Sequence, residues 1–397
     1  MRRKTFTQTN SLFFVGRLRS TVGILSFCFN LAIEIAARAE DPSDASPRFL
    51  GAQSCSSSSC HGGAAENRNQ YVAWCKLDYH SRSFATLTTA RSARLVEVLN
   101  LKNAATADRC TVCHAPIAEI PEARRAGVNI SDGVSCENCH GYAEPWIRSH
   151  TRADLSHSER TARGLRDLRD LHVRANTCVA CHQNLGGEIL AAGHPELIFE
   201  LDGQSATQPR HWREVRDHGQ IWLEGQIVAL REMSWQLVTA EKPEETLAAR
   251  WSALVWLLQK VNKADPAWPD LVGIELTGSR DAADRAQKTL EPFAKAVSQR
   301  SWETGLDVVL LKRLAKTAPD FENTAILPEI RARRAERLVL ALDRLALAAG
   351  NDSTASSVKD INSTIDQLFK LAQNIPEFNS FKFASALKEL DAKVVLR

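Results

Sequence analysis

Four short motifs combine two cysteines with a histidine directly after the second. Three have the form Cys-x-x-Cys-His, at residues 110–114, 136–140 and 178–182, and the one at 55–61 has four residues between its cysteines. Two thiols at this spacing can each add to a vinyl group of one porphyrin, and the histidine then lies under the iron as its proximal ligand. The sequence therefore predicts four covalently attached haem c groups. The predicted attachment residues are Cys55, Cys60, Cys110, Cys113, Cys136, Cys139, Cys178 and Cys181. The predicted proximal ligands are His61, His114, His140 and His182.

Zinc ribbons and disulfides are the two other common uses of closely spaced cysteines. Paired Cys-x-x-Cys motifs do bind zinc, but zinc has no need of a histidine directly after every second cysteine. Disulfides form readily in exported proteins, so close cysteine pairs there can also be oxidised. The motif at 55–61 departs from the usual haem spacing and is the one for which another use stays open. The fourfold repetition of the arrangement favours haem.

Seven further histidines are candidates for the opposite face of each iron. The chain has 11 histidines and only two methionines, so methionine ligation is nearly excluded, and haems with two histidines should have potentials at the lower end of the c-type range. His150 follows His140 by ten residues, with Gly141 and Pro145 between them. A ten-residue segment with a glycine and a proline reaches an adjacent haem more readily than the opposite face of the haem held by His140. We therefore predict that His150 is the distal ligand of a haem other than the one held by His140.

The first 39 residues have the organisation of a signal peptide. A basic segment without acidic residues (1–20) precedes a mostly apolar run (21–35), and Ala37-Arg38-Ala39 fits a signal-peptidase site. The apolar run is short for a bilayer span and contains Asn30 and Glu34. An uncleaved anchor and a lipoprotein site at Cys28 are the alternatives. We expect an exported, periplasmic protein, which agrees with haem attachment outside the cytoplasm.

The composition of the chain changes near residue 218. All histidines lie between His61 and His218, and the last cysteine is Cys181. Residues 47–218 have many glycines and serines and few long apolar runs, so we predict a tetrahaem cytochrome c domain of short helices and loops around the cofactors. Residues 219–397 are predicted to form an all-α domain of unknown role that binds no cofactor, and the fold class is therefore mainly α. Its helices are expected near 218–239, 243–261, 280–299, 302–317, 328–347, 357–373 and 379–395, with a turn at 351–357.

Two features of the helical part bear on its packing. Trp251 and Trp256 recur with apolar residues at helical spacing and are predicted to lie in the core. Four arginines of the 328–347 helix are predicted to form a solvated face with ion pairs such as Glu329–Arg333. These arginines are Arg331, Arg333, Arg334 and Arg337.

About half of the mature chain, residues 50–200, resembles a known family. The segment Gly-Val-Ser-Cys-Glu-Asn-Cys-His-Gly (133–141), the pattern Tyr-x-x-Trp-x5-His (71–80) and Gly193-His194-Pro195 are similar to those of the tetrahaem cytochrome c that takes electrons from hydroxylamine oxidoreductase. The resemblance implies haems packed in close parallel and perpendicular pairs, mostly with two histidine ligands, and one high-spin haem with an open side. The motif at 55–61 and the added helical region depart from the family and leave the partner unassigned.

The resemblance also assigns ligands. It implies that His80, His150 and His194 are distal ligands. The remaining iron either has an open side or takes one further histidine, and His218 is expected to be a surface or propionate-bonding residue. The candidates for that iron are His157, His172 and His211.

Three functions fit these features. The first is electron transfer between redox partner proteins. The second is a multihaem oxidoreductase acting on a small nitrogen or sulfur species at a five-coordinate haem, although the chain has no Cys-x-x-Cys-Lys variant. The third is a cytochrome subunit whose helical part binds a membrane-associated complex. Without residues 1–39 the chain is slightly acidic, so nothing indicates nucleic acid, and we expect an electron carrier rather than an enzyme.

Overall fold

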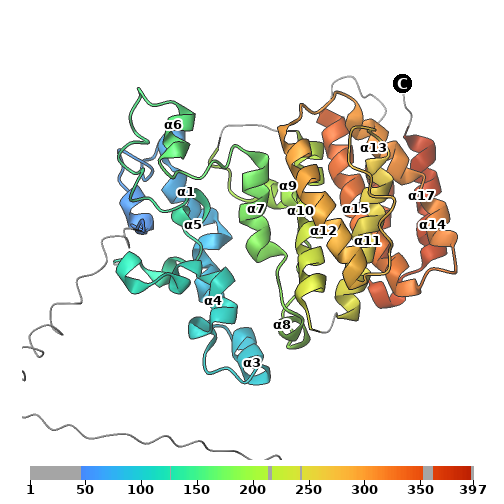
Figure 1. Cartoon of the computed structure of the whole chain (residues 1–397), viewed down its shortest axis with the longest axis horizontal. Helices are drawn as coiled ribbons and strands as arrows, with labels where there is room; N and C mark the ends of the chain where they lie inside the picture. Colours follow the sequence, from blue (N-terminus) through green and yellow to red (C-terminus); the bar gives the residue numbers. More distant parts are fainter. Residues whose placement is uncertain (1–45, 126, 213–216, 242–243, 352–360, 395–397) are drawn as a thin grey trace, which may run out of the picture. The chain divides into compact units, whose positions relative to one another are not determined.

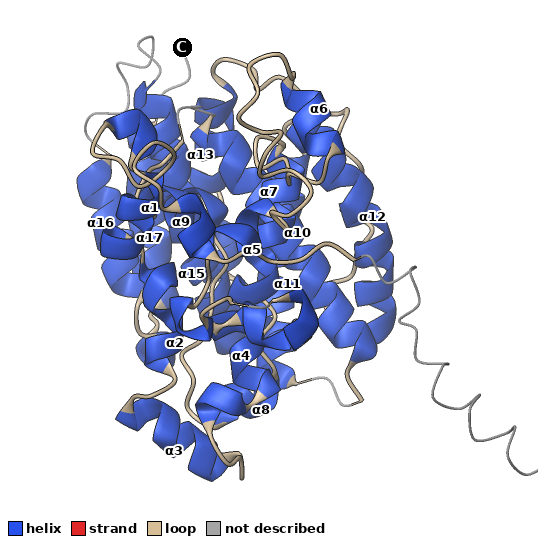
Figure 2. Ribbon diagram, turned by 90° about the vertical axis from the view of Figure 1, so that its left-hand side faces the viewer, coloured by secondary structure: helices blue, strands red, loops and turns tan. Residues whose placement is uncertain are grey.

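The computed structural model describes residues 46–394, except 126, 213–216, 242–243 and 352–360. The described residues are mainly helical and contain no β-strand, which confirms the predicted fold class (Figures 1 and 2). The predicted signal peptide (1–39) and most of the predicted turn at 351–357 lie outside the described residues. Across the described ranges, no helix combines the length and apolar character that a bilayer span requires.

The part with the cysteine motifs is built of short helices, turns and loops. Few of its large side chains are buried, as expected for a chain that depends on other groups for its apolar interior. Its 3₁₀ helices are η1 (Ala52–Cys55), η2 (Glu66–Arg68), η3 (Tyr79–Arg82), η4 (Ala104–Thr106), η5 (Pro116–Glu119), η6 (Glu122–Arg124) and η7 (Ile130–Asp132). Its α-helices are α1 (Gln70–Leu77), α2 (Ser83–Thr86), α3 (Ala90–Val98), α4 (Asp108–His114), α5 (Cys136–His140), α6 (His157–Ala162), α7 (Leu171–His182), α8 (Gly187–Ala191) and α9 (Leu201–Thr207).

The later part of the chain is made of longer helices at the predicted positions. They are α10 (His218–Thr239), α11 (Glu245–Asn262), α12 (Arg280–Gln299), α13 (Leu306–Ala315), α15 (Pro328–Asn351), α16 (Asn362–Ala372) and α17 (Ser380–Lys393). Two short elements, α14 (Ala318–Glu322) and η8 (Ile375–Glu377), lie outside the predicted ranges. The helix expected over 302–317 is shorter than predicted, because it begins only after Gly305, which has a left-handed φ of 83°.

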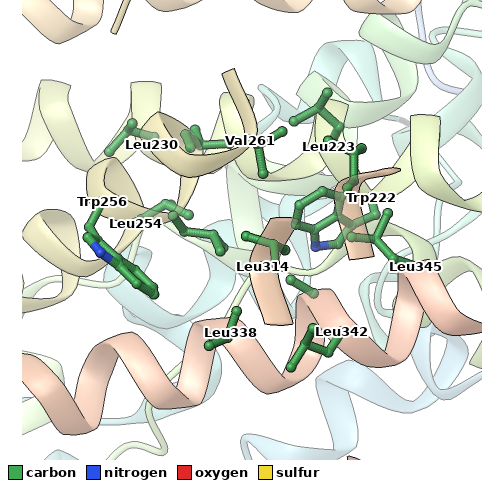
Figure 3. Close-up of a cluster of buried hydrophobic side chains, with 14 of the residues drawn as sticks. Trp222, Leu223, Leu230, Leu254, Trp256, Val261, Leu314, Leu338, Leu342 and Leu345 are labelled. Atoms are coloured by element: carbon green, nitrogen blue, oxygen red, sulfur yellow. The ribbon is translucent and has the colours of Figure 1, made fainter. Parts of the chain in front are cut away.

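Helix α10 is the centre of the core. All of its residues from 219 to 230 are buried, including Trp222 and Leu223, because its sequence is apolar around most of its circumference. Figure 3 shows side chains of α10, α11, α13 and α15 pointing toward one another, and Trp251 and Trp256 are buried as predicted. Leu171 of α7 and Leu201 of α9 belong to the same cluster. The packing is therefore continuous across the predicted boundary at 218/219, and the division into two domains stays a prediction.

The arginines of α15 differ from the prediction. Each of the four (Arg331, Arg333, Arg334 and Arg337) is buried instead of solvated, with exposures of 2–8%. Arg333 forms an ion pair with Glu196 at 2.6 Å, where the sequence predicted Glu329. Arg334 lies over the ring of Trp256, 5.1 Å from its centre. The prediction failed because other helices cover α15 on more than one side, a property that the sequence of a single helix does not show.

The crossing of α9 and α10 depends on a glycine. A Cβ at Gly225 would lie 2.7 Å from Cβ of Leu201 and 3.2 Å from its backbone nitrogen. We expect Gly225→Ala to lower the free energy of unfolding by about 1–3 kcal/mol, because α9 must move away from α10. Gly273→Ala is the matched control, since its Cβ would meet no atom within 4 Å. Chemical denaturation measures both variants, and an equal effect at the two positions would contradict the close packing.

Candidate haem-binding site

The Cys-x-x-Cys-His motifs lie at the ends of helices. Helices α4, α5 and α7 each end at the histidine of their motif, His114, His140 and His182. Two residues three positions apart share one face of a helix, so both thiols of a motif point to the same side. The fourth motif follows η1, which ends at Cys55, and continues as a turn to His61. All of the described cysteines have free thiols.

Each motif histidine faces one histidine that lies outside the motifs. The members of a pair come from segments far apart in the sequence, so the fold brings them together. The distances between ring centres are 6.2 Å for His61 and His150, 6.0 Å for His182 and His80, 6.4 Å for His114 and His194, and 6.5 Å for His140 and His211.

The width of these gaps matches a metal ion between two imidazoles. A metal–nitrogen bond of about 2.0–2.1 Å, with the nitrogen roughly 1.1 Å from the ring centre, places two opposed ring centres about 6.3 Å apart. Separations in this range also occur in ordinary aromatic contacts. The choice of partners is the stronger observation, because every pair joins one motif histidine to one histidine from elsewhere.

Hydrogen bonds at Nδ1 orient most of these rings. For His150, His194 and His211 the partner is a backbone carbonyl, at 2.6, 2.8 and 3.2 Å. A carbonyl only accepts, so Nδ1 carries the proton and Nε2 keeps its lone pair for a metal. Side chains meet three others: Gln70 Oε1 lies 2.9 Å from His61, Thr86 Oγ1 lies 2.9 Å from His114, and Asp78 Oδ1 lies 3.0 Å from His80. The backbone carbonyl of Ser83 also meets Nδ1 of His114, at 3.2 Å. No sequence pattern indicated Gln70, Thr86 or Asp78 in this role.

Burial keeps three of the motif histidines in the form that binds metals. Removal from water and, to a smaller extent, the nearby His211 together lower the pKa of His140 to about 4. Burial also lowers the pKa values of His114 and His182. These imidazoles are neutral at physiological pH, and a neutral imidazole is the form that donates a lone pair to a metal.

A large cavity is lined by two of the histidine pairs, His61–His150 and His140–His211. It has a volume of about 1290 Å³, above the roughly 300–1,000 Å³ of most single-ligand pockets. Its lining combines imidazoles, thiols and apolar side chains with arginines, which suit carboxylate groups such as haem propionates. The histidines that line it are His61, His80, His140, His150, His157 and His211. The arginines are Arg160, Arg166, Arg169, Arg174 and Arg210. This donor set fits haem.

Neighbouring motifs lie side by side. The thiols of Cys55 and Cys136 share a hydrogen bond that lowers the pKa of Cys55 to about 7. Burial and, to a smaller extent, the nearby Cys139 raise the pKa of Cys178 to about 12. A second thiol pair joins Cys181 to Cys113. The motifs thus follow one another in space in the order 55–61, 136–140, 178–182, 110–114.

Glu137 connects the motif at 136–140 to the segment that precedes the motif at 55–61. Its carboxylate is 1% exposed and accepts hydrogen bonds from the backbone nitrogens of Leu50 and Gly51 at 3.0 and 2.7 Å. It also accepts one from the nitrogen of Ala143 at 2.7 Å. One residue between the cysteines of α5 therefore fixes the segment that leads into the 55–61 motif.

The remaining histidines have other partners. His172 lies between Glu224 (2.8 Å) and Glu291 (3.2 Å), so carboxylates occupy both of its ring nitrogens. His157 Nε2 meets Asp167 Oδ1 at 2.8 Å, and His218 Nδ1 meets Asp202 Oδ1 at 2.8 Å. Among the three candidates for the fourth iron, the structure brings only His211 opposite a motif histidine within the described residues. Cys75 belongs to no motif and is exposed, although an unpaired cysteine is most often a buried small side chain.

Comparison with known families bears on this arrangement. Residues 54–141 match the family model described as cytochrome c554 and c-prime. This segment is therefore similar to c-type cytochromes. The family implies covalently bound haem c, and the matched range contains three of the four motifs and His80. The fourth motif and the helical part lie beyond it. Neither the curated proteins nor the solved structures contain a match to the chain.

Proposed function

We propose that this chain is a tetrahaem c-type cytochrome that transfers electrons between redox partner proteins. The observation that supports it best is the pairing of every motif histidine with one other histidine. Haem c supplies one-electron storage when bound, and two axial imidazoles leave no coordination position for a substrate. The proximal ligands in this proposal are the four motif histidines. The distal ligands are His150, His194, His211 and His80.

The order of the motifs supports an electron path. Attachment cysteines of successive motifs touch or influence one another electrostatically, from Cys55 to Cys136, from Cys139 to Cys178 and from Cys181 to Cys113. Covalent attachment at these points would hold the four cofactors in one continuous series. Electrons could then enter at one end of the series and leave at the other.

The main alternative is a multihaem oxidoreductase acting on a small nitrogen or sulfur species. Such an enzyme needs an iron with an open side. The resemblance to the tetrahaem cytochromes that accept electrons from hydroxylamine oxidoreductase also implies one haem of this kind. In the described part of the chain, each motif histidine instead has a histidine opposite it. We therefore favour electron transfer over substrate conversion.

Binding of external ligands separates these two functions. We expect the visible spectrum of the oxidised protein to stay unchanged with cyanide, and that of the reduced protein to stay unchanged with nitric oxide, because imidazoles occupy both axial positions. Binding of either ligand by about one quarter of the haem would identify one open iron and favour the oxidoreductase.

The proposal also covers the cellular compartment and the partners of this cytochrome. Residues 1–39 would direct export to the periplasm, and N-terminal sequencing of the mature protein should then begin near Glu40. Redox proteins are the proposed partners, and a membrane-associated complex that uses residues 219–397 is the further possibility. The continuous core between α7, α9 and α10 indicates that the helical part also supports the haem-bearing segment.

A further inference from the structure

One paired histidine differs from the others in the group that holds its Nδ1. Backbone carbonyls hold His150, His194 and His211, and neutral side chains meet His61 and His114. The Nδ1 atom of His80 instead meets Oδ1 of Asp78 at 3.0 Å. Within the described residues, Asp78 is the only carboxylate that meets a histidine of the four pairs.

The fold holds Asp78 firmly in this position. Asp78 precedes η3, and its Oδ1 also accepts from the backbone nitrogen of His80 at 3.0 Å. Its Oδ2 accepts from Gln208 Nε2 at 3.1 Å, and the residue is only 4% exposed. Both of its oxygens therefore accept hydrogen bonds, from His80 and from Gln208, as an ionised carboxylate does. A fixed negative charge therefore sits behind His80.

We propose that Asp78 is a positioning residue that lowers the reduction potential of the haem held by His80 and His182. The inference rests on the proposed function. A carboxylate that accepts the Nδ1 proton makes an imidazole a stronger donor through its other nitrogen. A stronger donor and a nearby negative charge both favour the oxidised iron, which carries one more positive charge than the reduced iron.

The opposite ligand of that haem lacks such a partner. Nδ1 of His182 lies 3.4 Å from Nε2 of Gln204, at the long end of hydrogen bonding. The amide oxygen of Gln204 is buried and has no hydrogen-bond partner. Turning the amide would place that neutral oxygen on His182, since its two ends are assigned from the surrounding bonds. In either orientation the carboxylate acts from the His80 side alone.

Asp78→Asn tests the inference, because it removes the charge and keeps an oxygen that can accept from His80. We expect four haems to bind and one of the four one-electron steps to move to higher potential. The expected shift is at least a tenfold change in the ratio of oxidised to reduced haem, about 59 mV for one electron. Potentiometric titration followed by visible and electron paramagnetic resonance spectra measures it.

Asp167→Asn is the matched control. Asp167 makes the same kind of contact with His157, at 2.8 Å, and that histidine faces no motif histidine. The control also removes one negative charge near the cavity, since His157 lines it. We expect all four steps to stay in place. An equal shift in both variants would show a general charge effect and overturn the role assigned to Asp78.

Adding a carboxylate behind a different histidine provides an independent test. Gln70→Glu places a carboxylate on Nδ1 of His61, where the amide oxygen now lies at 2.9 Å, and should lower a step different from the one that Asp78→Asn raises. This test decides the matter if Asp78→Asn does not fold. Fully loaded, low-spin variants without these shifts would overturn the inference and leave the proposed function standing. Fewer haems in the unaltered protein would instead count against the proposed function.

Discussion

His150→Ala should convert one of the four haems from low-spin to high-spin. The ring of His150 lies opposite that of His61, with 6.2 Å between ring centres and 16° between ring planes. The edge of Trp146 and the carbonyl of Ile147 fix its orientation, at 5.3 Å and 2.6 Å. Loss of the imidazole leaves one axial position open, so about one quarter of the low-spin electron paramagnetic resonance signal should be replaced by a high-spin signal.

The affected haem should be the one attached through residues 55–61, as His61 is the partner of His150. His157→Ala is the matched control, because His157 lines the same cavity but bonds Asp167. It should leave all four haems low-spin. If a folded, fully loaded His150→Ala protein keeps its whole low-spin signal, His150 is not a ligand.

Replacing both Cys55 and Cys60 by serine should remove one haem and leave three. The two thiols belong to the motif with four intervening residues, and serine cannot form the thioether bonds to the porphyrin. Intact mass spectrometry should show the loss of one haem from the chain. The variant should also lose the spectral effect of His150→Ala, because the haem on which His150 acts would be absent.

Cys75→Ser controls for the removal of a thiol. Cys75 is exposed and belongs to no motif, so this variant should keep four haems. If the Cys55/Cys60 variant also keeps four, the motif at 55–61 is not an attachment site. If that variant loses all haem while Cys75→Ser does not, the motif is needed for folding instead.

Much of the fold could be predicted from the sequence. The bounds of α10 and α12 agree with the predicted ranges, because apolar residues recur at helical spacing over many turns. The arginines of α15 could not be predicted, since the same spacing fits a solvated face and a face covered by Glu196 and Trp256. Local pattern specifies the helix, and tertiary contacts decide which of its faces are covered.

The candidate site was predictable in part for the same reason. The motif cysteines and histidines are neighbours in the sequence, so their spacing alone indicates the chemistry. The partner of His140 could not be chosen among His157, His172 and His211, because each lies in a loop or helix whose path depends on the whole fold. Carboxylates bind His157 and His172 away from the motifs, and this too is a property of the folded chain.

The number of haems bound to the unaltered chain tests the central claim most directly. A pyridine haemochrome assay combined with intact mass spectrometry gives this number on the full protein. We predict four covalent haems per chain, one for each of the motifs at 55–61, 110–114, 136–140 and 178–182. A count of three haems would mean that the motif at 55–61 binds none. Two or fewer in a folded protein matured under conditions that attach haem would contradict the central claim.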